Sequence, residues 1–144
     1  MSGWLFDTNV LSAFAPGRAT PAAYVIEWVE TNSEALFISA FTVMEVEAGI
    51  AKLRRSGALR RADALAAWLD GMLGLYEERV LQFDVEAARI AGLLHDAAIS
   101  VGRHPGLADI AIAAIARSRG LVLLTLNRRH FIPLGIETLN PFDA

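Results

Sequence analysis

Short apolar segments alternate along this chain with longer segments of helical character. The short segments are apolar at consecutive positions, which is typical of strands buried on both faces. Strands that alternate with helices of this length indicate an α/β fold, with a mostly parallel sheet of about four or five strands covered by helices on both faces. The predicted strands are residues 4–6, 36–39, 80–83, 121–124 and 136–138, and the predicted helices are residues 21–30, 42–55, 58–76, 85–100 and 107–119.

Residues typical of helix ends support several of these limits. Asp84 can cap the helix that starts at Val85, and Pro21 suits a first helical position. Ser56-Gly57 separates two predicted helices. Because the chain has the length of one domain and contains no internal repeat or low-complexity segment, we expect residues 1–144 to form a single domain.

The composition is apolar and slightly acidic. Hydrophobic residues make up 54% of the chain and charged residues 20%, so part of the apolar surplus is expected to face a partner. The net charge of −3 excludes a global attraction to nucleic acid, and any such binding must be local. The sequence contains no membrane-spanning segment, no pattern of a secretory signal and no cysteine. We therefore expect a cytoplasmic protein that does not bind membranes.

Three acidic residues are expected near one edge of the sheet. Asp7 follows the first predicted strand, Glu45 follows the second at a short distance, and Asp109 lies just inside the helix at residues 107–119. Sites in parallel sheets form at the carboxyl ends of the strands. These acids are therefore candidates for a common site.

Each acid also has a purely structural interpretation. Asp7 can cap a helix or form an Asx turn, and Thr42 with Glu45 fits a capping box. Asp109 suits a first helical turn because of the helix dipole. However, the helix that contains Asp109 is apolar on most faces, and a buried aspartate needs a partner or a metal ion.

Three carboxylates at one edge repel one another unless a proton or a cation neutralises them. Oxygen ligands combined with water and substrate phosphate are typical of Mg²⁺ or Mn²⁺. Zinc is not expected, because the three histidines lack ligand spacing and the chain has no cysteine. A divalent cation can activate water and stabilise a phosphoryl transition state, so the implied chemistry is phosphodiester hydrolysis.

Four segments in order carry a resemblance to a known family: "LFDTNVLSAF", "ISAFTVMEVEAGI", "GLADIAIAAIARSRGLVLLTLN" and "IPLGIETLNPF". On these segments, which span nearly the whole chain, the sequence resembles the PIN-domain ribonucleases and, within them, the VapC-type toxins of bacterial toxin–antitoxin pairs. The resemblance implies a single PIN-like domain. It also implies that Asp7, Glu45 and Asp109 are catalytic acids that hold Mg²⁺ or Mn²⁺, with Thr8 in support and a fourth family position at Asn127.

Two positions depart from the family pattern. Asn127 stands where relatives carry aspartate, and it can ligate only through a neutral oxygen or through water. His130 stands where relatives often have an acid just before Phe131, and we interpret it as a loop histidine packed beside Phe131 rather than a proton shuttle. Because the site has two fewer negative charges than that of relatives with acids at both positions, we expect it to hold one ion well. A second ion would need RNA phosphate for its recruitment.

Two surface features are candidates for partner contacts. A basic cluster at residues 52–61 is either a solvated face or a contact with the RNA backbone. An apolar stripe in the helix at residues 58–76 is either core or, in part, a groove for an antitoxin segment. The resemblance also implies a homodimer. The stripe consists of Leu65, Trp68, Leu69, Met72 and Leu73.

The function implied by the resemblance is a metal-dependent endoribonuclease toxin of a type II toxin–antitoxin pair. Its substrate would be tRNA or another structured RNA, its antitoxin would inhibit it, and it would contact operator DNA only through that antitoxin. The alternative is a PIN-like regulatory partner with weak or no catalysis in an operator-binding complex. A phosphatase of the haloacid-dehalogenase type fits poorly, because its second aspartate falls on Asn9 and the only lysine is Lys52.

Overall fold

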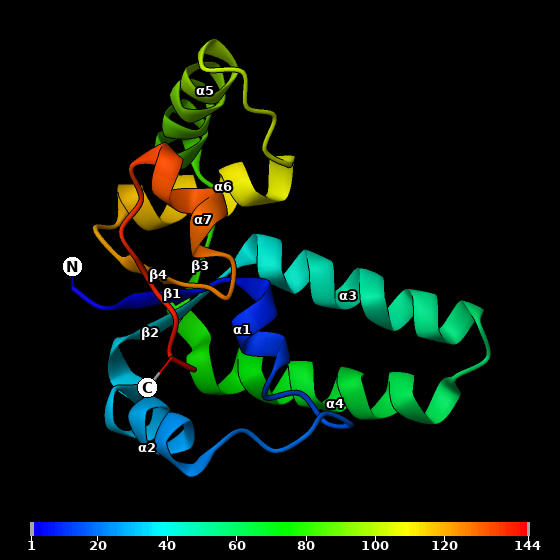
Figure 1. Cartoon of the computed structure of the whole chain (residues 1–144). Helices are drawn as coiled ribbons and strands as arrows, with labels where there is room; N and C mark the ends of the chain where they lie inside the picture. The colour runs from blue at the N-terminus through cyan, green and yellow to red at the C-terminus, as the bar shows by residue number, and fades with distance from the viewer. Residues whose placement is uncertain (1, 144) are drawn as a thin grey trace.

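The computed structural model describes residues 2–143, and in this range one sheet contains five strands (Figure 1). They are β1 (Trp4–Phe6), β2 (Leu36–Ser39), β3 (Val80–Leu81), β4 (Val122–Leu124) and β5 (Thr138–Leu139). The strand order β3-β2-β1-β4-β5 places β1 at the centre, and each neighbouring pair is parallel. The predicted α/β fold with a parallel sheet is confirmed.

Helices cover both faces of this sheet, as the sequence predicts. In the described range they are α1 (Thr8–Ser12), α2 (Ala23–Thr31), α3 (Ala40–Arg55), α4 (Leu59–Tyr76), α5 (Val85–Ser100), α6 (Leu107–Ser118) and α7 (Arg128–Phe131). Three 3₁₀ turns accompany them: η1 (Ser33–Ala35), η2 (Glu77–Arg79) and η3 (Ile132–Leu134). The helix pair α5 and α6 lies on one face, and α1, α2 and α4 contribute to the core of the other.

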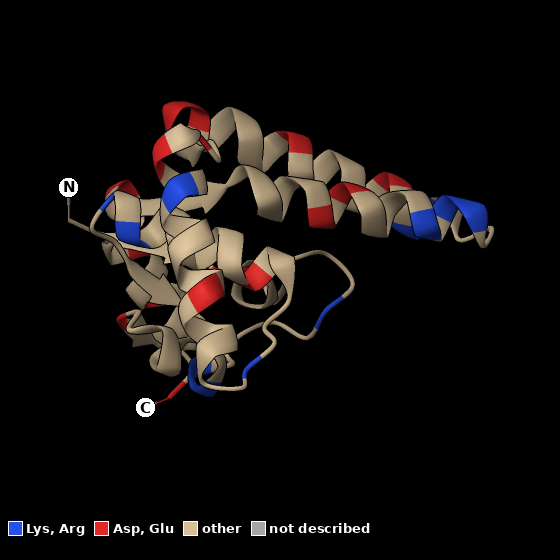
Figure 2. Ribbon diagram, turned by 90° about the horizontal axis from the view of Figure 1, so that it is seen from above, with Lys and Arg blue, Asp and Glu red and all other residues tan. Residues whose placement is uncertain are grey.

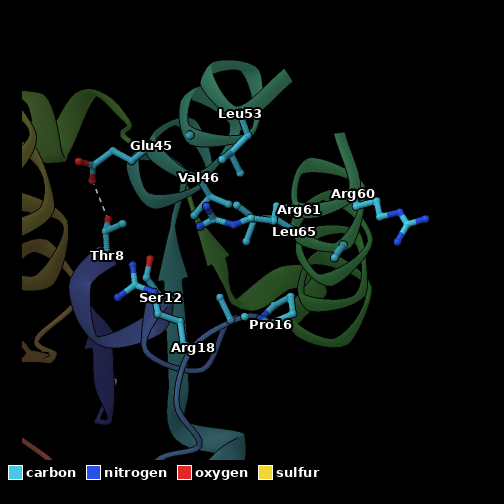
Figure 3. Close-up of a pocket in the computed structure, with 14 residues that line it drawn as sticks. Thr8, Ser12, Pro16, Arg18, Glu45, Val46, Leu53, Arg60, Arg61 and Leu65 are labelled. Carbon is cyan, nitrogen blue, oxygen red and sulfur yellow. Dashed lines mark hydrogen bonds between the residues drawn. The ribbon is translucent and has the colours of Figure 1, made fainter. Parts of the chain in front are cut away.

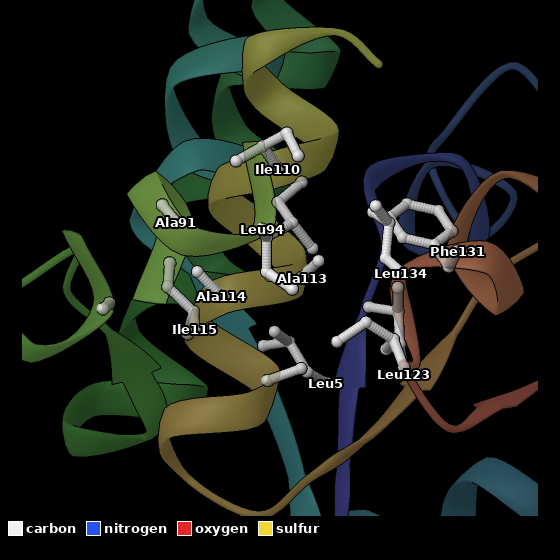
Figure 4. Close-up of a cluster of buried hydrophobic side chains, with 14 of the residues drawn as sticks. Leu5, Ala91, Leu94, Ile110, Ala113, Ala114, Ile115, Leu123, Phe131 and Leu134 are labelled. Carbon is white, nitrogen blue, oxygen red and sulfur yellow. The ribbon is translucent and has the colours of Figure 1, made fainter. Parts of the chain in front are cut away.

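Successive strand residues point to opposite faces and so build two cores. Leu5 pairs in register with Phe37 on β2 and with Leu123 on β4, and all three belong to the core under α5 and α6 (Figure 4). The next residue of β1, Phe6, belongs to the core on the other face, together with Leu124. Burial on both faces explains why the strands are continuously apolar in the sequence.

Helices α3 and α4 extend beyond the sheet as a hairpin with a third, smaller core (Figure 1). The predicted apolar stripe of α4 packs mainly inward, since Leu69 is buried and its other members lie against this core or the sheet core. The basic cluster lies at the far end of the hairpin, where Arg54 pairs with Asp63 at 2.7 Å (Figure 2). Its contact with RNA stays a prediction.

Two predicted helix starts are wrong, and the reasons are local. Helix α3 begins at Ala40 rather than Thr42, because the side chain of Ser39 accepts a hydrogen bond from the Thr42 N–H at 3.1 Å and acts as the cap. Thr42 and Glu45 therefore do not form a capping box. Helix α2 begins at Ala23, so Pro21 precedes the helix instead of occupying its first position.

Other predicted limits differ by a few residues or match. Asp84 caps α5 as predicted and accepts a hydrogen bond from the Ala87 N–H at 2.9 Å. Strand β3 ends at Leu81, two residues earlier than predicted, and the short helices α1 and α7 have no counterpart in the prediction. Within residues 2–143, no helix is both long enough and apolar enough to span a membrane.

Candidate active site

The carboxyl edge of the sheet carries an open cavity of about 370 Å³. Each residue predicted for the site borders it, although these residues come from four separate parts of the chain. Asp7 and Thr8 follow β1, Glu45 lies on α3, Asp109 lies on α6 and Asn127 follows β4. The remaining lining residues are Asn9, Ser12, Arg18 and Leu126. The structure thus brings together the five side chains named from the sequence.

Asp7 is the most buried acid of the site, with 6% of its surface exposed. Its Oδ1 accepts a hydrogen bond from the Thr8 N–H at 2.9 Å, so it caps α1 as one of the structural interpretations predicts. Its Oδ2 accepts a hydrogen bond from the Thr125 hydroxyl at 2.7 Å. The backbone N–H of Asp7 also donates to the Leu124 carbonyl at 2.8 Å. These contacts fix the carboxylate at the point where β1 ends.

A chain of hydroxyl groups orients Glu45. The Thr8 hydroxyl donates to Glu45 Oε1 at 2.6 Å (Figure 3). Thr8 Oγ1 lies 3.0 Å from Thr42 Oγ1, and because the Thr8 proton is already given to Glu45, Thr42 must be the donor in this contact. Ser39 in turn donates to Thr42 at 3.3 Å. Buried Ser39 and Thr42 therefore set the position of Thr8 and, through it, of the Glu45 carboxylate.

Asp109 lies in the first turn of α6 and faces a basic side chain. His130 Nδ1 is 3.8 Å from Asp109 Oδ2, and both side chains are partly exposed. His130 belongs to the short helix α7, which the sequence did not predict. The interpretation of His130 as a loop histidine packed beside Phe131 is therefore incomplete, since His130 lies on a helix and its ring also approaches the Asp109 carboxylate.

Burial and mutual repulsion weaken the acidity of two of the carboxyl groups. Burial raises the pKa of Asp7 above its ordinary value of 3.8; the Thr125 hydrogen bond opposes this rise, and the charges of Asp109 and Glu45 add to it. Burial also raises the pKa of Asp109, against the effect of His130 and with a contribution from Glu45. The three acids are therefore close enough to interact, and a cation between them would relieve the repulsion.

The donor set has the chemistry that a hard divalent cation requires. It consists of carboxylate oxygens, with the Asn127 amide and the Thr8 hydroxyl on the same cavity. Within residues 2–143, no three Asp, Glu or His side chains lie close enough to enclose an ion by themselves. A hard divalent cation held here would take one or two of these carboxylates and complete its coordination with water.

Ser39 and Thr125 were not predicted as site residues, and Thr42 was predicted only as a possible helix cap, although all three organise the site. Thr125 is fully buried; its hydroxyl donates to Asp7 and accepts from the Asn127 N–H at 3.0 Å. The sequence could have indicated the contact between Thr125 and Asp7. Thr125 follows β4 directly, as Asp7 follows β1, and these two strands pair in register at their last residues. Two residues that stand at the same position after neighbouring parallel strands lie side by side.

Comparisons with known proteins agree with this fold. The model of the family described as "PIN domain" matches residues 4–133. The chain is 34% identical to the "Plasmid stability protein StbB" of Pseudomonas syringae pv. tomato, over 97% of this chain and 99% of that protein. It is 33% identical to the "VapC ribonuclease Y4jK" of Sinorhizobium fredii, over 96% and 97%. The structure of DNA-bound VapBC from Salmonella typhimurium is similar, with a TM-score of 0.83, 27% identity and coverage of 98% and 99%.

Proposed function

Since this chain belongs to the PIN domain family, we propose that it is an endoribonuclease toxin of a toxin–antitoxin pair and that it depends on Mg²⁺ or Mn²⁺. The observation that carries the proposal is the convergence of Asp7, Glu45 and Asp109 on one cavity at the carboxyl edge of the sheet. The similarity to a VapC ribonuclease over nearly the whole chain supports RNA as the substrate class. Asp7, Glu45 and Asp109 would be the catalytic acids.

In the proposed mechanism, Asp7 and Asp109 would hold the divalent cation, and the Thr8 hydroxyl would keep Glu45 aimed at the same cavity. When bound, the cation supplies an activated water and neutralises charge that develops on the phosphate. Asn127 would orient water through its neutral amide. Hydrolysis of the RNA phosphodiester in this way would leave a 5′-phosphate and a 3′-hydroxyl.

We also propose that an antitoxin inhibits the protein by occupying the groove between α1, α3 and α4. This groove encloses about 370 Å³ and is lined by apolar Val46, Leu53 and Leu65, with the Arg61 side chain among them (Figure 3). It also includes Thr8 and Glu45, so a segment seated there would contact the acidic site. The structure of a DNA-bound VapBC complex supports a protein partner, through which this chain would reach operator DNA. We propose in addition that two copies of this chain form a homodimer.

Expression of the protein in a bacterial host, with growth as the readout, distinguishes this function from that of a non-catalytic binding partner. Expression of the wild type is expected to arrest growth and to produce RNA fragments with 5′-phosphate ends, whereas Asp109→Asn does neither. Asp96→Asn serves as a matched control, because Asp96 is exposed on α5, away from the site cavity. Equal growth arrest by Asp109→Asn, at equal protein level, would favour the binding partner.

Thr125→Val is expected to lower the rate of RNA cleavage by roughly tenfold to a hundredfold, because residues that orient a metal ligand have effects of this size. The substitution removes the donor to Asp7, which raises the pKa of this carboxyl further and moves the acidic limb of the pH–rate profile to higher pH. Thr125→Ser keeps the hydroxyl and should restore both the rate and the profile. A folded Thr125→Val protein with the wild-type rate and profile would contradict this role.

A further inference from the structure

A second open cavity, of about 310 Å³, borders the acidic site at Asp109. Its lining is unusual for a chain with net charge −3, because four of its eight residues are basic types and Asp109 is the only acid. The basic residues are Arg103, His104, Arg129 and His130, and the others are Pro105, Gly106 and Leu134. We call this the basic cavity.

The basic residues reach this cavity from two distant segments. Arg103 and His104 lie in the loop between α5 and α6, whereas Arg129 and His130 lie on α7, after β4. A run of charges within one segment is explained by solvation alone, but this convergence is produced by the fold. The N-terminus of α6 lines the same cavity through Gly106, and its dipole adds to the preference for an anion.

The two arginines of the basic cavity have no acidic partner within 4 Å in residues 2–143. Several other arginines are used structurally: Arg79 donates to the Ser33 and Leu36 carbonyls, Arg117 to the Leu134 and Gly135 carbonyls, and Arg119 to Asp84. Arg103 and Arg129 have no such role in the described range and are exposed. Their guanidinium groups are therefore available to an anion.

We propose that the basic cavity binds an RNA phosphate next to the phosphate that is hydrolysed, with Arg103 and Arg129 as its main donors. The inference rests on the proposed ribonuclease function and deepens it, because it names the residues that position the substrate. Guanidinium groups form charge-assisted, often bidentate hydrogen bonds with phosphate oxygens. A shared border at Asp109 places this phosphate beside the acidic site, and the backbone would run from one cavity into the other.

RNA binding without cleavage tests this assignment. We would measure the fluorescence anisotropy of a short, labelled, single-stranded RNA of mixed sequence with the full-length protein in EDTA, at several salt concentrations. Arg103→Ala combined with Arg129→Ala is expected to weaken binding at low salt by about tenfold or more. The slope of log affinity against log salt should fall by about 0.7 for the lost phosphate contact. Arg89→Ala, an exposed position on α5 outside the basic cavity, should bind like the wild type.

These outcomes test the phosphate site separately from the proposed ribonuclease function. Unchanged affinity and salt slope in the double variant would overturn the phosphate site, even if the wild type cleaves RNA. Loss of binding in the double variant would support the site, even if the wild type proved unable to cleave RNA. Equal loss of binding to a labelled polyglutamate peptide would assign the cavity to acidic protein segments and would also overturn the proposal.

Discussion

Asp7→Asn is expected to lower RNA cleavage at least about a hundredfold while the protein stays folded. If Asp7 holds the cation as proposed, loss of its carboxylate would remove transition-state stabilisation of several kcal/mol, which corresponds to this change in rate. The asparagine Oδ1 can still accept from the Thr8 N–H and so keep the cap of α1. The substitution thus separates the chemistry of Asp7 from its structural role.

The measurement for Asp7→Asn is the initial rate of cleavage of one RNA in Mn²⁺, with circular dichroism to verify the fold. Asp96→Asn is the control, because it makes the same chemical change at an exposed position away from the cavity. A rate close to that of the wild type in Asp7→Asn would leave Asp7 as a helix cap without a catalytic role.

The elements that dominate the core could be predicted from the sequence. Strands β1 and β2 match the predicted residues, because continuous apolar runs mark strands buried on both faces. The start of α3 was wrong, since Ser39 and Thr42 are both suitable caps and only the backbone geometry selects Ser39. That correction places Glu45 beyond the first turn of α3 and removes the capping-box interpretation of this residue.

The acids of the site were predictable, but the groups around them were not. Asp7, Glu45 and Asp109 could be named because each follows a strand or begins an apolar helix where a carboxylate is costly without a partner. The role of Thr125 depends on the register between β1 and β4. The basic cavity depends on the packing of the α5–α6 loop near α7, which no local pattern in the sequence encodes.

Removal of divalent cations is expected to lower wild-type cleavage to the level of Asp7→Asn, and Mn²⁺ or Mg²⁺ should restore it. The raised pKa values of Asp7 and Asp109 give this requirement a pH dependence. Because both carboxyl groups must lose a proton before they hold a cation, less Mn²⁺ should be needed as the pH rises above their pKa values. Without the ion, a carboxyl group whose pKa is raised in the folded protein costs stability once it ionises, so the fold loses stability as the pH rises through the pKa values of Asp7 and Asp109. Bound Mn²⁺ should therefore raise the melting temperature most at neutral pH.

The most direct test of the acidic site as a metal-dependent nuclease centre is a Mn²⁺ titration of the cleavage rate of one RNA after treatment with EDTA. The wild type and Asp96→Asn should show the same half-maximal Mn²⁺ concentration, whereas Asp109→Asn should need at least about tenfold more Mn²⁺ or show no cleavage. Cleavage by the wild type in EDTA alone, or an Asp109→Asn curve that coincides with that of the wild type, would contradict the account.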